Sequence, residues 1–337
     1  MSGVTLSLDA ACDLAEAVLT AAGTSPANAR ITAEALVAAE ADGLGSHGLA
    51  RLPAYADQAR SGKVDGAAAP ALEQVGAAAL RCDAGCGFAF PAIARGLDAA
   101  QELLPAAGVV ALAIRNSHHA GALGWAVERA AERGAAALAF TNSPAGIAPW
   151  GGAKGVFGTN PIAFAAPRRG QAPLVVDASL STVARGKLMV AAQKGEPIPE
   201  GWALDAEGRP TTDPKAGLAG TMMPLGGAKG AALVLMVEIL AAALTGGQFG
   251  FEASSFFTAD GPPPRIGQLF LLLDPERLGG ADFTARLEVL LGAILAQPGT
   301  RLPGDRRLAI RARAEREGIV IDGKLHAELL NRAGRAA

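Results

Sequence analysis

The segment from Asp42 to Arg51 brings side chains suited to acid–base chemistry close together. It reads DGLGSHGLAR and holds a hydroxyl at Ser46, an imidazole at His47 and a guanidinium at Arg51. Histidine has an ordinary pKa of about 6.5, so it can accept and return a proton near neutral pH. The planar guanidinium of an arginine is matched to a carboxylate. The spacing therefore predicts a site where His47 is a general acid and base, Ser46 orients it and Arg51 holds a carboxylate substrate.

The same letters, GLGSHG at residues 43–48, match the G-x-G-x-x-G pattern of Rossmann dinucleotide-binding folds. That pattern binds a pyrophosphate only when a strand precedes it and a helix follows it. Here the preceding residues, 29–41, have the apolar periodicity of a helix. The glycines are therefore expected to form a tight turn between two helices, and a Rossmann fold is not predicted.

Two further histidines fall in a second motif bracketed by polar and small residues. His118 and His119 belong to NSHHAG at residues 116–121, whereas His326 lies among Lys and Glu near the C-terminus. Adjacent histidines usually point their rings apart, and no spacing brings three or four ligands onto one ion, so no metal site is expected. The chain has no G-x-S-x-G elbow, and Ser46 beside its own base rarely reaches the geometry of a nucleophile, so hydrolysis is not favoured.

Length and composition narrow the class of protein. A chain of 337 residues can bury a large core and is expected to hold two domains. Its 30 basic and 32 acidic residues nearly balance, and only 4% of residues are aromatic. Neither a phosphate-binding basic face nor a base-stacking surface is indicated, so nucleic-acid binding is not expected.

Cysteine usage and hydropathy indicate a cytoplasmic protein. The three cysteines are odd in number, and Cys82 and Cys86 lack the spacing of a zinc site. No basic leader precedes the first helical pattern, so no signal peptide is expected. The longest apolar stretch, Ala231–Leu244, contains Glu238 and is shorter than the ~20 residues that a membrane span needs. We expect it to be a buried helix and expect no membrane association.

Helix and strand patterns place both histidine motifs at the ends of regular elements. Two predicted helices, Leu6–Ala22 and Pro26–Ala41, precede the SHG turn, and an apolar strand at Val109–Ile114 leads into NSHHAG. Further helices are predicted at Tyr55–Ala59, Phe90–Leu104, Leu123–Glu132, Asp282–Ala296, Arg306–Glu317 and Lys324–Ala333, and further strands at Leu80–Asp83, Ala135–Phe140, Ile162–Ala166, Leu174–Val176 and Leu269–Leu273. The turn-rich segment 196–219 is expected to lack long elements. The order indicates a mixed α/β fold.

A glycine-rich segment, PLGGAKG at residues 224–230, opens the apolar helix. Such a turn at a helix N-terminus offers free N–H groups and the positive end of the helix dipole, so it could hold a phosphate. It could equally be a tight packing turn with Lys229 lying along apolar surface. The sequence leaves both interpretations open.

Several motifs occur together in an order typical of one family. They are SHG followed by Arg51, NSHHAG, GTNP at 158–161, ARGK at 184–187, PTTDPKA at 210–216, GGAKG and LPG at 302–304. In these motifs the chain resembles the malate/L-lactate dehydrogenase type 2 family over nearly its whole length. That family contains NAD(P)-dependent malate, lactate, sulfolactate and ureidoglycolate dehydrogenases, diketogulonate reductase and cyclic-imine reductases.

The resemblance implies a fold and an assembly. It implies a mixed α/β protein whose non-Rossmann NAD(P)-binding domain, residues 116–284, is built on a largely antiparallel sheet. A helical or mixed domain would combine residues 1–115, which carry the SHG turn, with residues 285–337. The resemblance also implies a homodimer.

The resemblance further implies roles for residues at matching positions. Ser46, His47 and Lys187 would be catalytic, and Arg51, Thr159 and Arg185 would contact the substrate. Contacts to NAD or NADP would come from His119, Ala120, Gly121, Ala122, Leu123, Asp177, Ala178, Ser179, Lys229, Arg301, Pro303, Gly304 and Arg306.

One position bears on the choice of reaction. The imine-reducing relatives carry an acidic residue where this chain has Lys187, and a histidine where it has Ala228, whereas the ARGK form is associated with hydroxyacid enzymes. The chain is therefore expected to transfer a hydride between the nicotinamide and C2 of a small 2-hydroxyacid or 2-oxoacid of the malate, lactate or sulfolactate type. A cyclic-imine reductase and a non-catalytic metabolite-binding protein are the alternatives.

Overall fold

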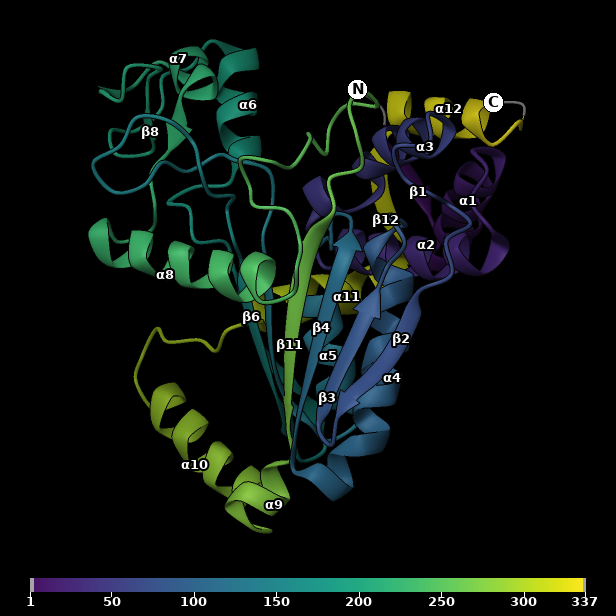
Figure 1. The fold of residues 1–337 in the computed structure, drawn as a ribbon, viewed down its shortest axis with the longest axis vertical. Helices are drawn as coiled ribbons and strands as arrows, with labels where there is room; N and C mark the ends of the chain where they lie inside the picture. Colours follow the sequence, from purple (N-terminus) through teal and green to yellow (C-terminus); the bar gives the residue numbers. More distant parts are fainter. Residues whose placement is uncertain (1–2, 336–337) are drawn as a thin grey trace.

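A seven-stranded sheet forms the centre of the computed structural model, which describes residues 3–335 (Figure 1). The strands lie in the order β2-β3-β4-β11-β5-β6-β7, and every neighbouring pair is antiparallel except β3 and β4. Their bounds are β2 Ala71–Gly76, β3 Ala79–Asp83, β4 Val109–Ser117, β5 Ala136–Thr141, β6 Ile162–Arg168, β7 Gln171–Ala178 and β11 Ile266–Leu273. The prediction of a mixed fold on a largely antiparallel sheet is confirmed.

Helices cover both faces of this sheet. Helices α4 (Ala89–Ala107) and α5 (Gly124–Glu132) pack on one face, and α8 (Ala228–Glu238) packs on the other. The central strand β11 is apolar almost throughout because its side chains alternate between the two covered faces: Phe270 belongs to the first core and Leu269 to the second. The helix α4 also explains the one parallel pair, since it carries the chain from the end of β3 back to the start of β4.

The two ends of the chain build a second layer together. Helices α1 (Leu8–Ala21), α2 (Pro26–Ala41) and α3 (Leu52–Arg60) pack with α11 (Asp305–Glu317) and α12 (Gly323–Arg332). Strand β1 (Gly3–Leu6) pairs antiparallel with β12 (Ile319–Asp322), so the first and last strands of the chain lie side by side. The sequence prediction missed β1, β2 and β12, and it began the first helix too early. The helix begins at Leu8 because the Ser7 hydroxyl caps it by accepting the Ala10 N–H.

A small lobe lies beside α8. It contains α6 (Arg185–Lys194), α7 (Pro214–Ala219) and a three-stranded sheet of β8 (Ala203–Leu204), β9 (Pro210–Thr211) and β10 (Thr221–Met222). Beyond α8 come the single π-helical turn η3 (Ile239–Ala243) and, after β11, the helices α9 (Pro275–Gly279) and α10 (Phe283–Leu295). None of the helices in residues 3–335 combines the length and apolar character needed to cross a membrane.

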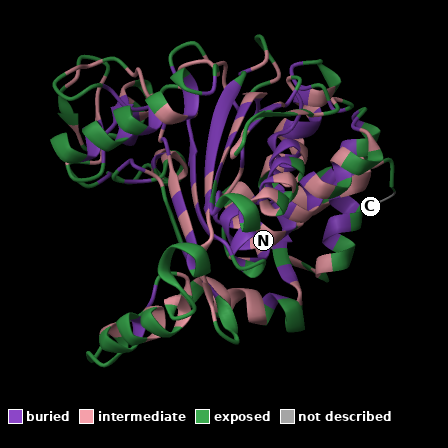
Figure 2. Ribbon diagram, turned by 60° about the horizontal axis from the view of Figure 1, so that its bottom comes forward, coloured by how far each residue is buried: buried purple, intermediate pink, exposed green. Residues whose placement is uncertain are grey.

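The apolar stretch Ala231–Leu244 is not the buried helix that its composition predicts. Figure 2 colours the central strands as buried and much of the peripheral helices as exposed. One side of α8 and η3 packs on the sheet, but the other leaves large side chains open to solvent: Leu233 43%, Leu235 46%, Ile239 51% and Leu244 62%. Composition alone could not show this, because both sides of the helix are apolar.

The predicted division into two domains remains a prediction. Its boundary at residue 115 falls inside β4, which runs from Val109 to Ser117. Strands on both sides of that boundary hydrogen-bond in the same sheet.

Candidate active site

Candidate site residues gather at one edge of the sheet. Strands β4, β5 and β7 run in the same direction, so their carboxyl ends meet there, beside the starts of β6 and β11. His118 and His119 follow β4, Thr141 ends β5, and Asp177 lies near the end of β7. Polar residues that are far apart in the sequence therefore face one space.

The SHG turn brings His47 to this edge. It consists of two short 3₁₀ turns, η1 (Gly45–His47) and η2 (Leu49–Arg51), between α2 and α3. Because a helix precedes it, the glycine pattern is not a Rossmann fingerprint, as predicted. The partly buried Glu40 accepts the Leu49 N–H at 2.9 Å, and a Cβ on Gly48 would lie 2.2 Å from the same carboxylate. Only glycine allows this close approach, so Gly48 fixes the path of the turn.

His47, Ser46, Arg51 and His119 come together around this turn. The Ser46 hydroxyl lies 3.0 Å from Nδ1 of His47, and the His47 and His119 rings stack with centroids 5.6 Å apart. Nε of Arg51 donates to the Ser46 carbonyl at 2.8 Å, and its guanidinium lies over the Phe257 ring at 4.6 Å. The structure thus groups the residues that the sequence proposed for proton transfer and carboxylate binding.

The surroundings of the histidines favour their neutral forms. Burial, with a smaller contribution from the positive charge of Arg51, lowers the pKa of His47 to about 4. Burial together with Arg51, His47 and His118 also lowers the pKa of His119 well below its ordinary value. Near neutral pH the free His47 is therefore an unprotonated imidazole, which is the form that accepts a proton.

Two side chains of helix α3 hydrogen-bond to the adjacent histidines His118 and His119. The Tyr55 hydroxyl lies 2.6 Å from Nδ1 of His119, and Oε1 of Gln58 lies 2.7 Å from Nε2 of His118. Sequence reasoning missed Tyr55 and Gln58. Their positions four and seven residues after Arg51, on one face of a helix, were the available signal.

A loop at residues 254–260 closes over the histidines. The ammonium of Lys63, a residue that is 2% exposed, donates to the carbonyls of Ser255 at 2.7 Å, Thr258 at 3.0 Å and Asp260 at 2.7 Å. The loop places the Phe256 ring 5.0 Å from the His119 ring. Lys63 therefore supplies hydrogen-bond donors to three loop carbonyls and fixes the loop that packs Phe256 against the histidines.

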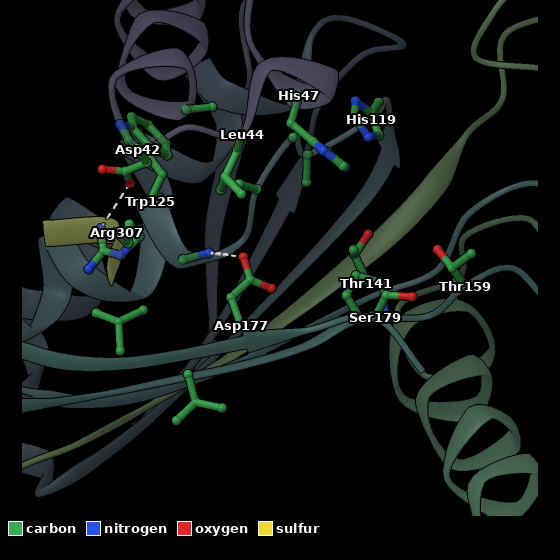
Figure 3. Close-up of a pocket in the computed structure, with 18 of the residues that line it drawn as sticks. Asp42, Leu44, His47, His119, Trp125, Thr141, Thr159, Asp177, Ser179 and Arg307 are labelled. Atoms are coloured by element: carbon green, nitrogen blue, oxygen red, sulfur yellow. Dashed lines mark hydrogen bonds and ion pairs between the residues drawn. The ribbon is translucent and has the colours of Figure 1, made fainter. Parts of the chain in front are cut away.

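A cleft of about 490 Å³ extends from His47 along the edge of the sheet. Figure 3 shows His47 and His119 on one wall and Thr141, Thr159, Asp177 and Ser179 on the opposite wall. Of the residues predicted for substrate, catalysis and cofactor, those that line it are His47, His119, Ala120, Gly121, Ala122, Thr159, Asp177, Ser179, Pro303 and Gly304. Its size falls in the range of ligand sites.

Small residues, Ala120, Gly121 and Ala122, line one wall of the cleft. Gly121 has a φ of +62°, and a Cβ there would lie 2.9 Å from the Phe90 ring. Opposite, Oδ2 of Asp177 accepts the Gly124 N–H at 2.7 Å, at the start of α5. Desolvation raises the pKa of the Asp177 carboxyl. The hydrogen bond from Gly124 and the positive charge of Arg307 act in the opposite direction but are weaker.

Partly buried ion pairs lie at the far end of the cleft. Arg307 and Arg311 of α11 each form ion pairs with Asp42 and Glu128, at distances of 2.6 to 2.9 Å. A second hollow of about 460 Å³ adjoins this end, and Arg301, Arg306 and Arg307 line it. The predicted residues Arg301 and Arg306 therefore lie at this second hollow, beside the first cleft.

The polar floor below Thr159 depends on the buried carboxylate of Glu238, which the sequence showed only as a charge within the apolar stretch Ala231–Leu244. Glu238 accepts hydrogen bonds from Nδ2 of Asn142 at 3.1 Å, Nδ2 of Asn160 at 2.7 Å and the Gly250 N–H at 2.7 Å. The hydroxyl of Ser143, next to Asn142, accepts the Thr159 N–H at 3.1 Å. The cleft loops at 142–143 and 158–160 are thus tied to one residue of α8.

Some predicted site residues lie away from the cleft. Lys187 and Lys229 are exposed on α6 and α8, and Arg185 donates to the Leu218 carbonyl at 3.3 Å within the small lobe. Leu123 is buried behind the cleft wall. Three predicted residues remain, and none of them lines the cleft. Ala178 lies between two lining residues, Ser46 contacts the lining residue His47, and Arg51 lies beside Ser46 in the same turn. Their roles remain predictions.

The structure shows neither a disulfide nor a metal-binding cluster within residues 3–335. Cys12, Cys82 and Cys86 are free thiols. Residues 3–335 contain no group of three or more His, Cys, Asp or Glu side chains arranged to hold a metal ion.

Comparison with known proteins agrees with the motifs. A sequence profile described as malate/L-lactate dehydrogenase matches residues 6–330. The chain is 56% identical over 306 residues to the (2R)-3-sulfolactate dehydrogenase (NADP(+)) of Chromohalobacter salexigens, covering 91% of each chain. The crystal structure of Δ1-piperideine-2-carboxylate reductase from Pseudomonas syringae pvar. tomato aligns with a TM-score of 0.93 and 43% identity, over 98% of this chain and 99% of that one. Sulfolactate dehydrogenase from Methanocaldococcus jannaschii aligns with a TM-score of 0.90 and 29% identity, over 98% of both chains. This chain therefore belongs to the malate/L-lactate dehydrogenase family.

Proposed function

We propose that this protein is an NAD(P)-dependent oxidoreductase that interconverts a small 2-hydroxyacid and its 2-oxoacid, of the malate, lactate or sulfolactate type. The observation that carries the proposal is the grouping of His47, Ser46, Arg51 and His119 around the SHG turn, where His47 and His119 line a cleft of about 490 Å³. A substrate there has a proton acceptor and a carboxylate partner within one turn of the chain.

In this proposal His47 moves the proton. Its lowered pKa makes the free imidazole neutral, so it can take the hydroxyl proton as the 2-hydroxyacid is oxidised. Arg51 would hold the substrate carboxylate, because within residues 3–335 only its Nε is hydrogen-bonded and the paired Nη groups stay available. In the reverse direction the negative charge of the bound substrate would raise the pKa of His47 and help it to carry a proton to the new hydroxyl.

The cleft fits a dinucleotide. The small side chains of Ala120, Gly121 and Ala122 would leave room for a flat ring, and the second hollow offers Arg301 and Arg306 to a phosphate. When bound, NAD or NADP would supply or accept the hydride at substrate C2. The two arginines support NADP in particular, since its additional phosphate needs cationic partners, and the printed name of the 56% identical relative also specifies NADP(+).

A cyclic-imine reductase is the second candidate. It is supported by the 43% identity and TM-score of 0.93 with Δ1-piperideine-2-carboxylate reductase. Two sequence features favour the hydroxyacid reaction: a lysine at position 187, where the imine-reducing relatives carry an acidic residue, and the higher identity to a sulfolactate dehydrogenase. A non-catalytic metabolite-binding protein is the remaining alternative.

We also propose that the protein acts in the cytoplasm as a homodimer. Its free thiols support a reducing compartment. The exposed apolar sides of α8 and α10 support a subunit interface: Val289 and Leu290 of α10 are 63% and 59% exposed, and Leu291 is its one buried residue. The partner would then be a second copy of this chain.

The decisive experiment measures turnover of reduced nicotinamide with a panel of 2-oxoacids and cyclic imines, using NADH and NADPH in turn. We expect the highest kcat/KM with a 2-oxoacid and NADPH. His47→Ala should lower kcat by about 10²- to 10⁴-fold while the affinity for NADPH changes little, because it removes the proton carrier and leaves the cofactor walls in place. His326→Ala, on α12, is the matched control. Higher kcat/KM with the imines would favour the second candidate, and no turnover at all would favour the binding protein.

A further inference from the structure

Tyr55, the single tyrosine of the chain, is fully buried directly behind His119. Its hydroxyl lies 2.6 Å from Nδ1 of His119. Its ring packs against Phe88 and His118, each with centroids 5.3 Å away, so the side chain is held in place. Within residues 3–335 this hydroxyl has no hydrogen-bond partner other than His119.

The direction of this hydrogen bond decides which nitrogen of His119 carries its proton. A neutral imidazole has one N–H and one acceptor nitrogen. If Nδ1 were the donor, the phenol proton of Tyr55 would be buried without an acceptor, which costs free energy. If Tyr55 donates, both groups are satisfied. Burial raises the pKa of Tyr55 and lowers that of His119, so both groups are neutral and this choice applies.

We infer that Tyr55 fixes His119 as the tautomer with its proton on Nε2. That nitrogen has no partner among residues 3–335 and is not enclosed by protein, and His119 lines the cleft. His119 then presents a hydrogen-bond donor to a carbonyl or carboxylate oxygen of a ligand in the cleft. Tyr55 is a positioning residue in this scheme, because it acts through His119.

The inference also separates the roles of two stacked imidazoles. His47 and His119 lie 5.6 Å apart, and either ring could in principle accept a substrate proton. With Nδ1 occupied by Tyr55 and Nε2 already protonated, His119 has no lone pair facing the cleft. His47 is then the base, and this assignment rests on the proposed function.

Gln58 fixes the tautomer of the neighbouring His118 in the same way. Its Nε2 donates to the carbonyls of Phe256 at 2.9 Å and Thr258 at 3.1 Å, so its oxygen must be the atom that faces His118. Nε2 of His118, 2.7 Å away, therefore carries the proton. The helix α3 thus selects the same tautomer for both histidines, through two different side chains.

The test is the protonation of the His119 ring nitrogens, measured by ¹⁵N NMR on the ligand-free protein near neutral pH. His119→Gln assigns the signals. We expect a protonated Nε2 and an unprotonated Nδ1 in the wild type, and a shift toward the other tautomer in Tyr55→Phe, which keeps the ring and deletes the hydroxyl. Phe88→Leu is the control, since it loosens the packing around Tyr55 without removing the hydrogen bond. A protonated Nδ1 in the wild type, or an unchanged spectrum in Tyr55→Phe, would overturn the inference.

Ligand titrations then identify the acceptor. We expect Tyr55→Phe to weaken one ligand about tenfold, the loss of roughly one good hydrogen bond. Weaker NADPH binding by fluorescence would assign the acceptor to the cofactor, and a raised KM for the 2-oxoacid would assign it to the substrate. If neither changes, the donor role of His119 is wrong. The NMR result needs no turnover, so failure of the proposed function would leave the tautomer test standing.

Discussion

Replacing Glu238 by glutamine would test how the polar floor of the cleft is held. The Glu238 side chain is buried at the end of α8, and one of its oxygens accepts Nδ2 of Asn142 and the Gly250 N–H, while the other accepts Nδ2 of Asn160. Glutamine has nearly the same shape but keeps only one accepting oxygen. Its amide N–H groups would therefore face at least one buried donor.

The size of the effect follows from these bonds. Losing one hydrogen bond to a charged group and leaving one buried donor unpaired should cost about 2–4 kcal/mol. Asn160 cannot relieve the conflict by turning its amide, because its Nδ2 also donates to the Val234 carbonyl at 3.0 Å. For a chain of this length we expect Tm to fall by roughly 3–6 °C.

Glu238→Gln should also weaken substrate binding. Asn142 precedes Ser143, whose hydroxyl accepts the Thr159 N–H, so loss of the carboxylate loosens the loop that positions Thr159. We expect KM for the 2-oxoacid to rise about tenfold, equivalent to roughly 1.4 kcal/mol. Calorimetry and steady-state kinetics on Glu238→Gln provide the measurement, with the exposed Glu200→Gln as control. An unchanged Tm would refute the energetic argument, and a lower Tm with unchanged KM would refute the positioning role.

Three further predictions follow from the charges and surfaces. Lys187 is exposed on α6 outside the cleft, so Lys187→Asp tests whether it reaches the substrate, as the family resemblance implies. If it does, the ratio of kcat/KM for 2-oxoacids to that for cyclic imines should move by roughly one to two decades toward the imines, because a carboxylate favours a cationic iminium; an unmoved ratio would show that Lys187 acts away from the reacting centre. Burial lowers the pKa of His47 to about 4 and of His118 to about 3. Below about pH 6.5 the unfolded chain therefore binds protons at these histidines that the folded chain does not, so the free energy of unfolding should fall as pH falls from 6.5 toward 3. A Tm that stays constant over that range would exclude this origin. Light scattering should give about twice the chain mass of 33.8 kDa, and a single-chain mass would rule out the dimer.

Local sequence was sufficient to place the two histidine motifs and to predict much of the scaffold. The SHG turn lies between two helices and NSHHAG follows a strand, both as their periodicity predicts. The helical pattern before Gly43 was enough to exclude a Rossmann fingerprint. These inferences succeed because caps, turns and amphipathic patterns depend on residues within a few positions of one another.

Tertiary structure alone decided which buried groups serve the site. Tyr55 meets His119 across 64 positions, Asn142 meets Glu238 across 96, and Lys63 meets the loop at 254–260 across nearly 200. No spacing rule connects such pairs. β11 also lies between β4 and β5 although more than 120 residues separate it from either, which brings the histidines beside the cleft loops. A buried polar group must find a partner wherever the fold places one, so its role is set by the packing of distant segments and not by its neighbours in the chain.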